Sequence, residues 1–168
     1  EDWHLVSAGH GFTDGPAASA SGEVFFTDTI SFHNNTQSNS IWRISPEGKL
    51  SVWTNSTSRI SGQTFGASGQ LYVTALSDSK ILAYERAGKA AIIATELTGN
   101  DLVAAHNGNI YVTDLAATPG RVWLIKPGSE KQAVDTGIRS ANGIALSPDQ
   151  TLLYVAEYRS HWVYSYQI

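Results

Sequence analysis

Cysteine is absent from this 168-residue chain, which excludes disulfide bonds, thiolate metal sites and cysteine nucleophiles. Charged residues are scarce, at 15% of the chain, and the net charge is −4 with no run of Lys or Arg. We therefore expect no nucleic-acid partner and no polybasic membrane patch. No apolar stretch approaches the roughly 18 residues of a transmembrane helix, so a soluble protein without a membrane partner is predicted. These features do not identify the compartment, for which the periplasm and the cell exterior are candidates.

Apolar residues, in contrast, are plentiful, and they recur in a pattern. They make up 42% of the chain, which is enough for one globular domain with a core of its own. Four segments share the order aliphatic, aromatic, apolar, small and, in three of the four, acidic, which is typical of short β-strands. They are residues 24–28, 71–75, 110–114 and 153–157. Their aromatic residues, Phe25, Tyr72, Tyr111 and Tyr154, are 47, 39 and 43 positions apart.

The segment that follows each of these strands also repeats. Residues 41–44, 81–84, 122–125 and 163–166 share one apolar pattern. A period of about 40–45 residues with four short strands per unit is typical of the blades of a β-propeller. A Greek-key sandwich also has short strands, but it gives no reason for the same residue types to return at this period. The sequence therefore predicts an all-β fold.

The predicted fold is a β-propeller of four-stranded antiparallel blades, with about four blades in this chain. We expect the sheets near residues 13–55, 62–95 and 101–136, with a fourth from 143 onward. Residues 3–7 are predicted to be a strand that completes the fourth sheet. Residues 1–168 are accordingly interpreted as a single propeller domain or a propeller fragment.

A short polar residue begins each predicted innermost strand. These residues are Asp14, Ser61, Asn100 and Asn142, and Asp101 follows the third of them. Innermost strands line the central channel of a propeller, so their equivalent ends should converge. Carboxylate and amide oxygens suit a hard divalent cation such as calcium or magnesium. The alternative is that these polar residues, three of which precede Gly, simply form turns that the repeat copies into every blade.

These motifs resemble those of the SMP-30/gluconolactonase/LRE-like family. The resemblance is carried by FTDGPA at 12–17, GEVFFTD at 22–28, NDLV at 100–103, GNIYVTD at 108–114, NGIALSPD at 142–149 and LYVAE at 153–157. It implies a six-bladed propeller that holds one divalent metal on its axis and hydrolyses sugar lactones or related esters. Calcium is the expected cation, and magnesium, manganese and zinc are the alternatives.

The resemblance also implies roles for single residues. Asp14, Asn100 and Asn142 fall at or beside the metal-binding positions of the family. Asn100 and Asp101 fall where the family holds a substrate hydroxyl or a water molecule. Asp14 and Asp101 are the carboxylates matched to that region, and they are therefore the candidate catalytic residues.

Two departures from the family pattern leave other functions open. Asp14 stands where the family usually has a Glu, and the family's last metal ligand, an Asp on a later blade, has no counterpart before Ile168. The first alternative is a non-catalytic propeller that binds a ligand or a protein. The second is an incomplete propeller that assembles with another copy of itself or with a second chain.

Overall fold

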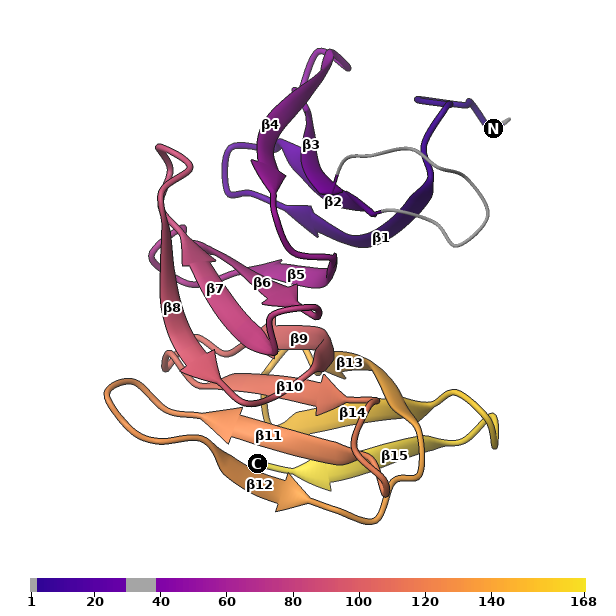
Figure 1. The fold of residues 1–168 in the computed structure, drawn as a ribbon, viewed down its shortest axis with the longest axis vertical. Coiled ribbons are helices and arrows are strands. Elements are labelled where there is room, and N and C mark those ends of the chain that lie inside the picture. The colour runs from indigo at the N-terminus through magenta and orange to yellow at the C-terminus, as the bar shows by residue number, and fades with distance from the viewer. Residues whose placement is uncertain (1–2, 30–38) are drawn as a thin grey trace.

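The computed structural model of this chain describes residues 3–29 and 39–168. All regular secondary structure in these residues is β-strand. It forms four antiparallel sheets (Figure 1). The first sheet contains β1 (Phe12–Ala18), β2 (Val24–Thr29), β3 (Asn39–Ile44) and β4 (Leu50–Ser56). The second contains β5 (Ile60–Phe65), β6 (Leu71–Ala75), β7 (Lys80–Tyr84) and β8 (Ala90–Thr95). The third contains β9 (Gly99–Ala104), β10 (Ile110–Asp114), β11 (Arg121–Ile125) and β12 (Gln132–Asp135). The fourth contains β13 (Ala141–Leu146), β14 (Leu152–Glu157) and β15 (Val163–Gln167).

This arrangement confirms the predicted β-propeller with four blades. Each sheet pairs its strands in chain order, and its first strand lies against the first strand of the next sheet: β1 contacts β5, β5 contacts β9, and β9 contacts β13. These four strands are therefore the innermost strands of the blades. Among residues 3–29 and 39–168 there is no helix that is long and apolar enough to cross a membrane.

The hairpin that joins the first two strands of each blade is set by one turn position. Gly22, Gly69 and Gly108 occupy this position with φ of 82°, 85° and 85°. Each donates its N–H to the carbonyl three residues earlier. Gln150 takes the same position in the fourth blade with φ of 56°. Glycine favours such a turn because it adopts positive φ without a steric penalty.

Three apolar cores fill the spaces between neighbouring blades. The aromatic residue of each repeat packs toward the following blade: Phe25 lies in the first core, Tyr72 against the second and Tyr111 in the third. In the fourth blade Leu153 and Val155 enter the third core. Tyr154 lies between them in β14, so it points to the opposite face of its sheet and is only half-buried.

The predicted opening strand is wrong. Residues 3–7 form no strand, and the fourth sheet consists of β13, β14 and β15 only. The physical reason lies in the residues that follow this segment. His10 Nδ1 and the Gly11 N–H both bond the carboxylate of Asp28, each at 2.9 Å. These bonds hold the start of the chain beside the first blade, away from the fourth.

Candidate functional site

Threonine hydroxyls connect the polar residues at the starts of the innermost strands. Thr27 Oγ1 lies 3.1 Å from the carbonyl oxygen of Asp14 and 2.8 Å from that of Ser61, so it joins the first blade to the second. Thr74 Oγ1 lies 3.3 Å from the carbonyl oxygens of Gly62 and Asn100 and joins the second blade to the third. Both threonines are completely buried. Their hydroxyls therefore hold neighbouring strands at one level along the axis.

The same device joins the third blade to the fourth. Thr113 Oγ1 bonds the carbonyl oxygens of Asp101, at 3.2 Å, and of Asn142. The next repeat has Ala156 at this position, which carries no hydroxyl. The threonines thus bring the four predicted axial positions onto adjacent strands at matching register. The signal for these bonds in the sequence is the threonine that recurs at the small position of the first three repeats.

Two glycines allow the innermost strands to approach closely. A Cβ atom built on Gly15 would lie 2.7 Å from the backbone nitrogen of Gln63, and the φ of Gly15 is +54°. A Cβ atom on Gly62 would lie 2.4 Å from Asp101 Oδ1 and 2.6 Å from the Cα atom of Asp101. The glycine that follows each short polar residue in the first two blades therefore lies within a strand and has a packing role.

The two candidate catalytic carboxylates differ in their surroundings. Asp14 accepts hydrogen bonds from Ser61 Oγ at 2.5 Å and from the Gly15 N–H at 2.8 Å. Asp101 accepts one from the Leu102 N–H at 2.8 Å. Burial raises the pKa of Asp101 to about 6, and the charge of Asp14 acts weakly in the same direction against backbone hydrogen bonds from Leu102 and Ile144. Asp101 thus changes charge close to neutral pH, where a general acid or base is most effective.

Asp14 and Asp101 line one cleft, with a volume of about 490 Å³. Its walls include Gln63 and Thr64 from the second blade and Ile144 from the fourth. The cleft therefore opens among all four innermost strands. Asn100 and Asn142 lie at the same level but do not line this cleft, and neither amide side chain forms a hydrogen bond within the described part of the chain.

The donors at these positions suit a hard cation by their chemistry. They are carboxylate and amide oxygens, and among residues 3–29 and 39–168 the two amide side chains have no hydrogen-bond partner. No group of three His, Cys, Asp or Glu side chains that could hold a metal ion occurs in residues 3–29 and 39–168. A cation at this level would therefore rely on the amide oxygens of Asn100 and Asn142 in addition to Asp14.

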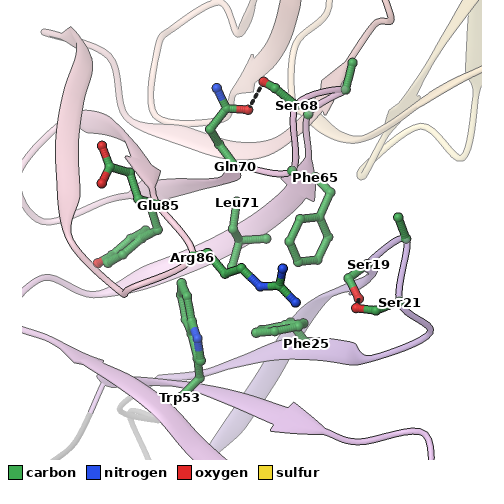
Figure 2. Close-up of a pocket in the computed structure, with 15 residues that line it drawn as sticks. Ser19, Ser21, Phe25, Trp53, Phe65, Ser68, Gln70, Leu71, Glu85 and Arg86 are labelled. Atoms are coloured by element: carbon green, nitrogen blue, oxygen red, sulfur yellow. Dashed lines mark hydrogen bonds between the residues drawn. The ribbon is translucent and has the colours of Figure 1, made fainter.

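A second cavity lies elsewhere, between the first and second blades, with a volume of about 650 Å³ (Figure 2). Its walls are the rings of Phe25, Trp53 and Phe65, and Arg86 reaches over Phe25 toward Ser19. It contains none of the axial polar residues. We interpret it as the open end of the first apolar core, because Phe25 belongs to that core and Trp53 and Phe65 pack against it.

The acidic residues that end the repeated strands bind nearby polar groups. Asp28 Oδ1 accepts from the N–H groups of Gly11 and Phe12. Asp114 accepts from Trp123 Nε1 at 3.1 Å and from the N–H groups of the turn that follows it. Glu157 is buried, and hydrogen bonds from Ser160 and the turn after β14 lower its pKa. All three stabilise local structure, as expected for strand-end residues.

Comparisons with known proteins agree with this architecture. A family model described as "SMP-30/Gluconolactonase/LRE-like region" matches residues 80–168, slightly more than half of the chain. No curated protein matches the chain. A gluconolactonase structure from Xanthomonas campestris is 20% identical with a TM-score of 0.85, and the alignment covers 97% of this chain and 60% of that one.

Two further solved structures are similar. A candidate gluconolactonase is 20% identical with a TM-score of 0.84, with coverage of 98% of this chain and 62% of that one. A chain of a nidogen–laminin complex is 16% identical with a TM-score of 0.81, with coverage of 92% and 60%. At these identities the similarity establishes the fold. The chain spans less than two thirds of the length of each of these structures.

Proposed function

We propose that this chain, which belongs to the SMP-30/gluconolactonase/LRE-like family, is a lactonase-type hydrolase acting on sugar lactones or related esters. The observation that carries the proposal is the axial cleft, which is lined by two carboxylates, Asp14 and Asp101, and by residues of all four innermost strands. The relatives of similar fold include a gluconolactonase, and this supports a small lactone as the substrate. The second candidate function is that of a non-catalytic propeller. It is supported by the nidogen–laminin complex, in which a chain has the same fold.

The proposed site holds one divalent cation, with calcium as the first choice, through Asp14, Asn100 and Asn142. When bound, the cation supplies a Lewis acid that polarises the lactone carbonyl and stabilises the developing negative charge. Asp14 is held for this role by its hydrogen bonds from Ser61 and Gly15. Asn142 and Asn100 would contribute their amide oxygens.

Asp101 is the proposed general base. In its ionised form it accepts a proton from the attacking water and later returns that proton to the leaving oxygen. Its pKa near 6 makes the ionised form available at neutral pH and keeps the carboxyl basic enough to take a proton. The Asn100 amide is proposed to bind a substrate hydroxyl beside it.

The test replaces Asn142 by Ala. We expect the affinity for calcium to fall about 10–100-fold, which is the usual effect of removing a side chain that supports a metal site. Hydrolysis of gluconolactone, followed by acid release at constant pH, should be lost with it. The control is Asn55→Ala, because Asn55 lies exposed on the outer strand β4, where its side chain accepts from Ser40 Oγ and from no axial residue of the described part of the chain.

Calorimetry and thermal unfolding separate the possible outcomes. Calcium should release or absorb heat on binding and raise the unfolding temperature of the starting protein and of Asn55→Ala, but not of Asn142→Ala. A starting protein that shows no calcium heat, no thermal stabilisation and no lactone hydrolysis would contradict the proposal and favour the non-catalytic propeller.

A further inference from the structure

A serine, a histidine and an aspartate lie in line at the edge of the first blade, apart from the axial cleft. Ser7 Oγ is 2.5 Å from His10 Nε2, and His10 Nδ1 is 2.9 Å from Asp28 Oδ2. No member of this group lines the axial cleft. A nucleophile bonded to a base, with the base oriented by a third group, is the general arrangement for activating a hydroxyl.

The hydrogen-bond chemistry allows one assignment of protons. An ionised Asp28 carboxylate can only accept, so His10 Nδ1 carries the proton that joins these two residues. A neutral imidazole then has a lone pair on Nε2. Ser7 therefore donates its hydroxyl proton toward His10, which leaves its oxygen poised to attack an electrophile.

The histidine and the aspartate are firmly held. Asp28 Oδ1 accepts hydrogen bonds from the N–H groups of Gly11, at 2.9 Å, and Phe12, at 3.2 Å. The His10 ring meets Phe26 and Trp42 edge-on, with 5.1 Å between ring centroids in both cases. The side chains of His10 and Asp28 are only 12% and 14% exposed. The base and its orienting carboxylate are therefore preorganised.

The serine, in contrast, is accessible. Ser7 is half-buried, and its neighbours Val6 and Ala8 are exposed. Gly9 turns the chain with φ of 84°, between the serine and the histidine. The N–H groups of Ala8, Gly9 and His10 have no hydrogen-bond partner among the described residues.

We propose that Ser7, His10 and Asp28 form a second hydrolytic site, which cleaves small, unhindered carboxylic esters without a metal ion. Ser7 Oγ attacks the ester carbonyl while His10 Nε2 takes the hydroxyl proton. His10 gives this proton to the departing alkoxide, which leaves as an alcohol, and Ser7 becomes acylated. A water molecule, deprotonated by His10 Nε2, then attacks the acyl carbon, and the bond from that carbon to Ser7 Oγ breaks. His10 returns the proton to Ser7 Oγ, so that the carboxylic acid leaves and both the serine hydroxyl and the neutral imidazole are restored. Asp28 is a positioning residue that holds the tautomer of His10.

The test uses a fluorophosphonate, which phosphonylates activated serines with loss of fluoride, and p-nitrophenyl acetate, both in the presence of EDTA. We expect mass spectrometry of the digested protein to place the adduct on Ser7. Ser7→Ala should abolish the adduct and lower the EDTA-resistant hydrolysis about 100-fold, the size of a typical general-base contribution. Ser45→Ala is the matched control, because Ser45 Oγ bonds a carboxylate, Glu47, with no histidine between them.

Asp28→Asn tests whether Asp28 positions His10. The readout is a proton resonance of His10 that packing alone would not produce. The Nδ1 proton of His10, donated to a carboxylate, should give a far-downfield proton resonance in the starting protein and in Ser7→Ala, and none in Asp28→Asn. The labelling rate of Ser7 should fall about 100-fold in Asp28→Asn. An adduct absent from Ser7, or equal labelling of Ser7 and Ser45, would overturn the proposal, because Ser7 would then carry no activation.

Discussion

Asp101 lies where three innermost strands meet. Its carboxylate accepts from the Leu102 N–H within β9, interacts with the backbone of Ile144 in β13, and lies over Gly62 in β5. The same packing that positions this carboxylate removes it from water. Its chemistry is therefore a consequence of its burial as much as of its residue type.

The raised pKa of Asp101 predicts a pH dependence of stability in calcium-free protein. Its folded value, about 6, exceeds the ordinary value of 3.8 that applies in the unfolded chain, so the unfolded chain ionises first as the pH rises. The stability that Asp101 contributes is fully present below about pH 3.8 and is lost as the pH rises through about 6. The unfolding temperature of the starting protein should therefore fall relative to Asp101→Asn across this window.

Circular dichroism melts in EDTA at intervals between pH 4 and pH 7 give the comparison. Because the amide introduced by Asp101→Asn cannot ionise, the difference between the two unfolding temperatures should change across the window and become constant above it. A difference that is the same at every pH would contradict the burial argument for Asp101.

At the scale of the strands, the approach of β5 to β9 depends on Gly62. An added Cβ atom would lie 2.6 Å from the Cα atom of Asp101, which is backbone and cannot rotate away. Gly143 occupies the equivalent place on β13, but a Cβ atom there would come no closer than 3.8 Å, to the Cβ atom of Ala156. Two glycines of one repeat position thus face different constraints.

We predict that Gly62→Ala lowers the free energy of unfolding by about 1–3 kcal/mol, the usual cost of overpacking. Gly143→Ala, the control, should change it much less, because its Cβ atom has ordinary van der Waals room. Urea denaturation followed by tryptophan fluorescence measures both. Equal losses in the two variants would show that the strand separation between β5 and β9 is not the cause.

For the whole molecule, the fourth blade is the part on which a prediction about association in solution rests. β15 is the edge strand of a three-stranded sheet, and Val163 is 64% exposed on it. Trp162 and Tyr158, in the turn before it, are also exposed. Unpaired edges with apolar side chains favour pairing with another chain.

This chain is accordingly expected to self-associate. Light scattering after size-exclusion chromatography should give a mass above 18.1 kDa that falls on dilution. Val163→Lys should shift the protein toward the monomer, because an exposed lysine blunts a strand edge. Lys80→Arg, a conservative change on β7, serves as the control. A monomer at all concentrations, with cooperative unfolding, would contradict this prediction.

Much of the fold and part of the candidate site could be predicted from the repeated order of residue types along the chain. Phe25, Tyr72, Tyr111 and Tyr154 recur with their strands, and repetition of a short unit is visible in sequence because each blade uses the same local rules. The axial polar positions followed from the same register. Asp14 and Asp101 could be placed at the axis for this reason, although their metal-binding and catalytic roles remain predictions.

The tertiary structure decided those features that depend on contacts between segments far apart in the sequence. The sequence by itself determined the repeated strands, the turns between them and the order of the blades, because periodicity and turn residues act over a few positions. It did not determine the pKa of Asp101, which arises from burial among three blades. Nor did it determine the route of residues 3–10. That route depends on the contact of His10 with Asp28, two residues that are 18 positions apart in the sequence. That contact kept the opening segment on the first blade and placed Ser7 beside His10.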